Sequence, residues 1–185
     1  MTHDVRMIPG RRVLLLSTQE TDLPALLRLW NDGAVMRWVC FPDGLGYDLE
    51  KMHEWLRRIQ ANRDRHHFTV YAGDGLFCGE VYASLDRERR RASLDIKFVP
   101  EAQGKGRSRD AFGTLIDWVF RTLPEADAVW VEPWPNNLAA RTLYYSCGLR
   151  QTTRPDDLRE GPSYWELTRP AWSAMPRLGP EGGTR

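Results

Sequence analysis

Three consecutive segments with two-residue alternation constrain the fold more than any other part of the sequence. His67–Ala72, Leu76–Leu85 and Arg91–Val99 each predict a strand. The joins between them are short, because Gly73-Asp74-Gly75 is typical of a hairpin turn and residues 86–90 form a charged turn. Strands joined by such short turns pair with their chain neighbours. The sequence therefore predicts an antiparallel meander over residues 67–99.

Apolar residues at helical spacing surround this meander. Helices are predicted over residues 21–30, 48–62, 106–122 and 137–147. Further strands are predicted over residues 12–17, 128–132, 149–153 and 163–168, and residues 34–46 indicate a short helix or an irregular loop. The order β-α-α-β-β-β-α-β-α-β-β predicts an α+β fold, with a mixed, mostly antiparallel central sheet flanked by helices.

The length of the chain fits one domain. A chain of 185 residues can bury a core without disulfides or metals. We expect one domain over residues 1–172. Residues 173–185 are rich in proline and glycine and predict a flexible tail.

Composition excludes several classes of protein. The chain carries 26 Lys and Arg against 25 Asp and Glu, which argues against a globally basic nucleic-acid binder. It has no apolar run of about 20 residues and no signal-peptide core, so no membrane partner is expected. The three cysteines form no Cys-x-x-Cys pair, and the adjacent His66 and His67 face opposite sides of a strand. We therefore expect no metal site and a reduced, cytoplasmic location.

The segment from Gln103 to Arg109 joins the third meander strand to the strongest helix. Two glycines let the backbone turn tightly there, and the first helix amides are unpaired. With the helix dipole and three cationic side chains, they predict a site for a phosphate or pyrophosphate. The spacing fits neither a Walker A motif nor a dinucleotide-binding fingerprint. A basic loop that merely starts a helix is the alternative interpretation.

A second segment about thirty residues later strengthens the functional interpretation. The loop reads Gln103-Gly104-Lys105-Gly106-Arg107-Ser108, and the later segment places Asn137, Ala140, Tyr144 and Gly148 in the pattern Asn-x-x-Ala-x-x-x-Tyr-x-x-x-Gly. In this order they resemble the GCN5-related N-acetyltransferase (GNAT) superfamily over about residues 12–169. Ser108 and Leu149 depart from the family's usual Gly or Ala and Phe. Residues 29–38 are similar to the RimJ/RimL-like branch.

The resemblance implies a binding site for acetyl-coenzyme A (acetyl-CoA), the acetyl donor. Backbone amides would hold its pyrophosphate, the strand end would hold the pantetheine arm and thioester carbonyl, and an asparagine would contact the arm from the other side. The residues implied for the strand end are Phe98 and Val99, and the residue implied for the arm is Asn137. The residues implied for the pyrophosphate are Gln103, Gly104, Lys105, Gly106, Arg107, Ser108 and Arg109.

The resemblance also implies two proton-transfer groups. Tyr144 would act as the general acid for the leaving thiolate, although a tyrosine on an apolar helix stripe can also be a core residue. Glu80, on the middle strand of the meander, would act as the base that takes the proton of the amine. Asp95, on the next strand, is the competing candidate, and either carboxylate could instead be solvated or paired.

The sequence thus predicts an N-acetyltransferase that moves an acetyl group to a primary amine by direct attack through a tetrahedral intermediate. The acceptor would be a protein N-terminus, an antibiotic or another small-molecule amine. The alternative is a non-catalytic acyl-CoA-binding or sensing module on the same fold. A homodimer is also an expectation, and the sequence does not choose among the acceptors.

Overall fold

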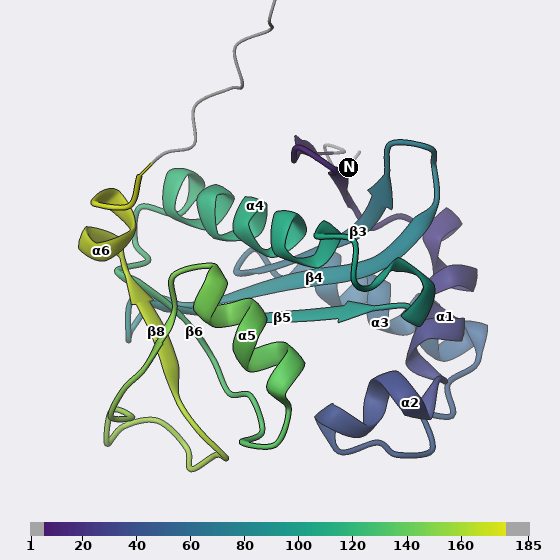
Figure 1. Cartoon of the computed structure of the whole chain (residues 1–185). Helices are drawn as coiled ribbons and strands as arrows, with labels where there is room; N and C mark the ends of the chain where they lie inside the picture. The colour runs from purple at the N-terminus through teal and green to yellow at the C-terminus, as the bar shows by residue number, and fades with distance from the viewer. Residues whose placement is uncertain (1–5, 177–185) are drawn as a thin grey trace, which may run out of the picture.

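The computed structural model describes residues 6–176, and an eight-stranded sheet runs through the molecule (Figure 1). The strand order is β1-β2-β3-β4-β5-β6-β8-β7, and every neighbouring pair is antiparallel except β5 and β6. This arrangement confirms the α+β prediction. The strands are β1 Met7–Pro9, β2 Val13–Ser17, β3 Arg65–Ala72, β4 Phe77–Asp86, β5 Arg91–Phe98, β6 Ala128–Val131, β7 Arg150–Gln151 and β8 Trp165–Thr168.

Helices cover both faces of this sheet. In Figure 1, α4 and α5 lie in front of the sheet, whereas α1, α2 and α3 gather at its right-hand end and behind it. A short final helix, α6, follows β8 directly. The helices are α1 Leu23–Trp30, α2 Gly33–Met36, α3 Leu49–Ala61, α4 Arg107–Thr122, α5 Leu138–Ser146 and α6 Arg169–Ser173. Among the residues that the structure describes, none of these helices has the length and apolarity needed to cross a membrane.

The predicted alternation of the third meander strand, β5, sorts its side chains between the two faces. Ala92, Leu94 and Phe98 are buried in the main core, together with apolar residues of α4 such as Phe112. Ser93, Asp95 and Lys97 alternate with them and lie on the opposite face. A second apolar cluster lies among α1, α2 and α3. The sheet therefore carries one mostly apolar face, on which His66 packs against Trp118 of α4, and one face on which polar groups gather.

The parallel pair β5–β6 separates early, and this separation creates the opening in the sheet. β5 pairs with β6 only from Arg91 to Ser93, whereas it pairs with β4 along its whole length. β6 ends at Val131, and the chain then leaves the sheet toward α5, as Figure 1 shows. The edge of β5 from Leu94 to Phe98 consequently lacks a neighbouring strand. This edge can offer main-chain groups such as the Phe98 N–H to an extended ligand, although the Ile96 N–H and the Phe98 carbonyl already bond to side chains.

Short elements account for the differences from the predicted order. β1 pairs antiparallel with β2 and was not predicted, since three residues carry too little periodicity. The strand predicted over residues 149–153 is only Arg150–Gln151. α6 crosses the expected domain end at residue 172, and Met175 lies against Gly148. Of the expected tail, residues 177–185 lie outside the described residues.

Candidate active site

The loop between β5 and α4 has the geometry of an anion cradle. Gly104 and Gly106 have φ values of 74° and 72°, in the left-handed region that favours glycine. Nothing lies within 4 Å of a Cβ built on Gly104, and the first atom near Gly106 is 3.8 Å away, so the concave side is open. The Gln103 side chain fixes the start of the loop by donating from Nε2 to the Phe98 carbonyl at 3.0 Å.

The first turn of α4 supplies the donors. The Asp110 N–H bonds the Gly106 carbonyl at 3.1 Å, so the N–H groups of Arg107, Ser108 and Arg109 precede the first full helical hydrogen bond. Arg107 adds a buried guanidinium nitrogen, Nη1, that has no hydrogen-bond partner among the described residues. Unpaired amides at the positive end of a helix dipole form a binding site that suits a pyrophosphate. The residues of this loop therefore fit the phosphate groups of a coenzyme.

The strand end offers the Phe98 N–H to a ligand, whereas the Val99 N–H is already used within the protein. The Val99 N–H already donates to the Cys78 carbonyl at 3.0 Å, and the Val99 carbonyl accepts from Ala102 at 3.0 Å. Hydrogen-bonded and non-bonded pairs alternate in an antiparallel ladder. Phe98, which faces Gly79, therefore directs its N–H away from β4 and into the opening. The expected main-chain contact from Val99 therefore falls to its carbonyl, which keeps one acceptor site and stays a prediction.

Asn137 begins α5, the helix that carries Tyr144. Its Oδ1 accepts from the Ala140 N–H at 3.1 Å and so caps the helix. This bond uses the amide oxygen and leaves Nδ2 as the group that can donate to a ligand. The spacing between Asn137 and Tyr144 is two turns of one helix, which places both residues along the same side of α5.

Tyr144 is buried, with 7% of its surface exposed, and its ring lies 5.0 Å from the ring of Phe112. Burial raises the pKa of the Tyr144 phenol above its ordinary value. The negative charge of Asp95 adds to this effect, and the positive charge of Lys97 opposes it. The phenol therefore stays protonated through neutral pH, as a hydrogen-bond donor must. The Tyr144 ring thus packs in the core, and its hydroxyl lies close enough to Asp95 for the carboxylate charge to affect it.

Glu80 lies at the centre of a buried network on the polar face of the sheet. Its Oε2 accepts from Trp30 Nε1 at 2.7 Å and lies 3.0 Å from His67 Nε2, and its Oε1 accepts from Lys97 Nζ at 3.0 Å. Burial favours the neutral acid, but the charges of Lys97 and His67 and their hydrogen bonds outweigh burial and lower the pKa of Glu80 to about 2. With 2% of its surface exposed, this carboxylate is ionised and enclosed. These properties weaken Glu80 as a general base.

Asp95 lies closer to solvent and to the opening than Glu80 does. Its side chain is 36% exposed, and its Oδ2 binds the ammonium of Lys97. Its Oδ1 accepts from the Ile96 N–H at 2.8 Å. By the same alternation that governs Phe98, this N–H points toward the free edge of β5. The Asp95 carboxylate therefore lies at the rim of the opening, where an incoming amine could reach it.

The comparisons with known proteins identify the family. The sequence matches the model of the acetyltransferase (GNAT) domain over residues 12–150. The chain belongs to this family. The expectation of an acetyltransferase is thereby confirmed at the level of the family, as is the predicted fold. A search of curated proteins found no match.

Solved structures share the fold of this GNAT domain at low sequence identity. Spermidine N-acetyltransferase from Vibrio cholerae, in complex with CoA and spermine, is 19% identical with a TM-score of 0.76, covering 88% of this chain and 98% of that one. The aminoglycoside acetyltransferase AAC(6')-Ib with coenzyme A is 21% identical, with a TM-score of 0.70 and coverage of 87% and 97%. A putative ribosomal-protein-serine acetyltransferase from Vibrio cholerae is 18% identical, with a TM-score of 0.71 and coverage of 91% and 99%.

In this GNAT domain, the partners that hold the Glu80 carboxylate could not be predicted from the sequence. Trp30, His67 and Lys97 come from α1, β3 and β5, and no local motif joins them. The alternation of β5 does place Lys97 and Asp95 on one face, but the register that sets Lys97 opposite Glu80 is a tertiary property. His67 is buried and also bonds Thr18 at 2.7 Å through Nδ1, so it is more enclosed than expected.

Proposed function

We propose that this GNAT domain transfers the acetyl group of acetyl-CoA to a primary amine. One observation carries the proposal: the free edge of β5 and the anion cradle of α4 meet at the same strand end. The Phe98 N–H points into the opening, and the amides at the start of α4 lie a short loop away. A ligand that joins an extended, hydrogen-bonding arm to a pyrophosphate matches this arrangement.

Each part of the cradle has a proposed role toward the donor. The amides from Gln103 to Arg109, which include those of Gly104, Lys105, Gly106, Arg107 and Ser108, bind the pyrophosphate. Phe98 N–H donates to the arm or to the thioester carbonyl, where a fixed donor stabilises developing negative charge. Asn137 Nδ2 donates to the arm from the side of α5. When bound, acetyl-CoA supplies the acyl group as an activated thioester.

Tyr144 and Asp95 are the proposed proton-transfer groups. Asp95, at the rim of the opening, accepts the proton that the amine must lose to become a nucleophile. As the new C–N bond forms and the C–S bond breaks, the Tyr144 phenol donates its proton to the leaving sulfur. Glu80, first in rank from the sequence, is reassigned to holding the Lys97 ammonium, and Lys97 in turn holds Asp95.

The branch of the family, the acceptor and the oligomeric state are also proposals. A RimJ/RimL-like assignment is supported by residues 29–38 and by the likeness to the putative ribosomal-protein-serine acetyltransferase. Under that assignment the acceptor is the N-terminal amine of a peptide or protein. A homodimer is retained as an expectation, and the solved spermidine N-acetyltransferase from Vibrio cholerae includes a dodecameric form.

Release of free thiol tests the proposal. The protein is mixed with acetyl-CoA and with panels of peptides, amino acids, polyamines and aminoglycosides, and thiol is followed over time. Amine-dependent release, lost in Tyr144→Phe, is the expected result. Saturable binding of acetyl-CoA without release for any amine would instead identify a non-catalytic binding module.

A further inference from the structure

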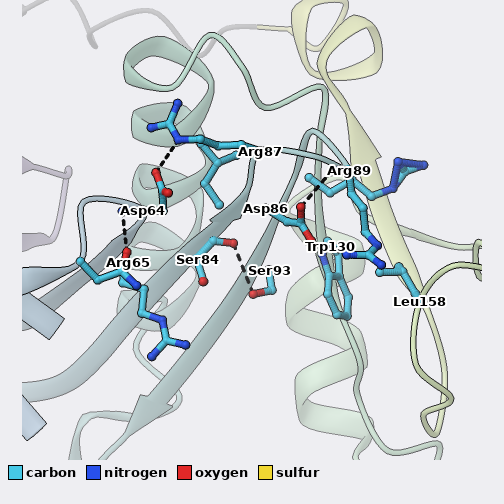
Figure 2. Close-up of a pocket in the computed structure, with 12 residues that line it drawn as sticks. Asp64, Arg65, Ser84, Asp86, Arg87, Arg89, Ser93, Trp130 and Leu158 are labelled. Carbon is cyan, nitrogen blue, oxygen red and sulfur yellow. Dashed lines mark hydrogen bonds and ion pairs between the residues drawn. The ribbon is translucent and has the colours of Figure 1, made fainter. Parts of the chain in front are cut away.

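A cavity of about 450 Å³ lies on the polar face of the sheet, beyond the proposed reaction site along β5. Figure 2 shows its floor, where Ser84 and Ser93 lie side by side. Asp64, Arg65 and Arg87 stand on one side, and Trp130, Arg89 and Leu158 on the other. Arg65, Ser84 and Ser93 form one row across β3, β4 and β5, because Arg65 pairs with Ser84 and Ser84 with Ser93. The cavity is therefore built on regular strands.

This cavity adjoins the proposed base. Ser93 and Asp95 lie on the same face of β5, two residues apart, and Arg91 lies two residues further along. At about 3.3 Å per residue, the Cα atoms of Asp95 and Arg91 are separated by about 13 Å along the strand. An acceptor whose amine reaches Asp95 can therefore extend along β5 into the cavity.

The carboxylates of the cavity are already occupied by cations. Asp64 binds Arg87 at 2.7 Å. Asp86 binds Arg89 at 2.8 Å, and the hydrogen bonds from Arg89 hold the pKa of that carboxyl below its usual value. Arg87 and Arg89 are themselves shared with further acids, Glu125 and Asp157. Neither lining carboxylate is therefore left to bind an ammonium group of a ligand.

Two arginines of the cavity, in contrast, have guanidinium N–H groups that no described residue accepts. The guanidinium of Arg65 has no ion-pair partner among the described residues. Arg91 engages Glu166 and the Tyr164 hydroxyl through Nε, at 3.2 and 3.3 Å. Its two Nη groups have no hydrogen-bond or ion-pair partner among the described residues, and a guanidinium binds a carboxylate best through such paired donors. The cavity therefore offers unpaired guanidinium groups, whereas its carboxylates are already paired. This difference favours the binding of an anion.

We infer that the acceptor is an amine carrying a carboxylate about 13 Å from the reacting nitrogen, and that Arg65 and Arg91 bind this carboxylate. An extended peptide of four residues spans this distance. The indole of Trp130 and the side chain of Leu158 give the intervening residues an apolar wall. The inference rests on the proposed acetyl transfer and narrows its acceptor to short peptides or N-terminal segments with an acid at the fourth residue.

The test compares three acceptors: Ala-Ala-Ala-Ala with a free C-terminal carboxylate, the same peptide amidated at its C-terminus, and Ala-Ala with a free carboxylate. The kcat/KM of the free tetrapeptide is expected to exceed that of the amide by about tenfold, the effect of one charged hydrogen bond. The dipeptide is expected to lose this advantage because it is too short. Spermidine is expected to be a poor acceptor.

Substitutions assign the effect to the cavity. Arg65→Gln should reduce the ratio of kcat/KM between acid and amide toward one, and Arg65→Lys should keep part of it. Arg57→Gln, on the exposed side of α3 and outside the cavity, is the matched control and should keep the wild-type ratio. Arg65 is exposed, so its variants should fold, and thermal unfolding verifies this.

The outcomes separate this inference from the proposed function. Thiol release with equal kcat/KM for the free and amidated tetrapeptides, or a preference for spermidine, would overturn the inference and leave acetyl transfer standing. Absence of release with every amine would overturn the proposed function as well. An acid-to-amide ratio that Arg65→Gln leaves unchanged would show that the carboxylate binds elsewhere.

Discussion

Lys97 and Glu80 face each other across β4 and β5 and form a buried ion pair, with Nζ 3.0 Å from Oε1. The ammonium also binds Asp95, so one cation joins an enclosed carboxylate to a partly exposed one. Burial disfavours the charge of Lys97, yet Asp95 and Glu80 together raise its pKa above the ordinary value. The two carboxylates therefore differ in role: Glu80 is enclosed and structural, whereas Asp95 is exposed enough to contact an amine.

Substitution of the two carboxylates should have opposite effects on activity and stability. Asp95→Asn should lower kcat by about 100-fold and remove the acidic limb of the pH–rate profile, because the proposed base is lost. Glu80→Gln should instead lower the free energy of unfolding by about 1.5–3 kcal/mol, since the buried Lys97 loses one of its two carboxylate partners and keeps only Asp95. Urea unfolding and initial rates measure both variants. A stable Glu80→Gln protein that loses the acidic limb would restore Glu80 as the base.

Tyr144→Phe should lower kcat by about 100-fold with little change in the affinity for acetyl-CoA. The ring contact with Phe112 is kept, so the loss reports the hydroxyl and not the core. Tyr145→Phe, at the exposed neighbouring position, is the control. Steady-state kinetics and binding by calorimetry measure the two quantities. Unchanged turnover would remove Tyr144 as the acid.

Gly106→Ala should weaken acetyl-CoA binding several-fold while leaving turnover at saturating donor close to that of the wild type. There is room for the methyl group, but φ of 72° costs a residue with a Cβ about 1–2 kcal/mol, and the loop would shift to relieve it. Gly73→Ala, in the open hairpin turn before β4, is the control. Titration with CoA checks the difference, and equal affinities would argue against the cradle.

His66 should make the protein less stable in mild acid. Burial, followed by the charge of Arg6, lowers the pKa of His66 from 6.5 to about 4, so the folded protein holds it neutral. Between these values the unfolded chain binds more protons than the folded chain, and stability therefore falls as pH decreases from 6.5 toward 4. One proton gives a slope of up to about 1.4 kcal/mol per pH unit.

Unfolding by urea at several pH values measures this slope. His66→Gln should reduce it, because glutamine does not titrate. His53→Gln, on the exposed surface of α3, is the matched control for removing a histidine. A slope that survives in His66→Gln would assign the acid sensitivity to other groups.

Most of the regular elements could be predicted from the sequence because they carry long periodic signals. The meander strands, α3 and α4 lie within a few residues of their predicted bounds. The loop after β5 was also predictable, since glycines at left-handed positions and a following helix start are local features. The elements that were missed or shortened, β1, β7 and α6, hold five residues or fewer, which is too short for a periodic signal.

The sequence by itself determined the kinds of elements, their order and the two motifs that mark a GNAT domain, because periodicity, glycine positions and helix starts act over a few residues. Only the tertiary structure decided which carboxylate meets solvent and which strand-end amide is free. Trp30 reaches Glu80 across 50 residues of sequence, and Lys97 reaches it through the register of β4 and β5. Burial and charge balance at Glu80 arise from those long-range contacts, and a linear pattern does not contain them.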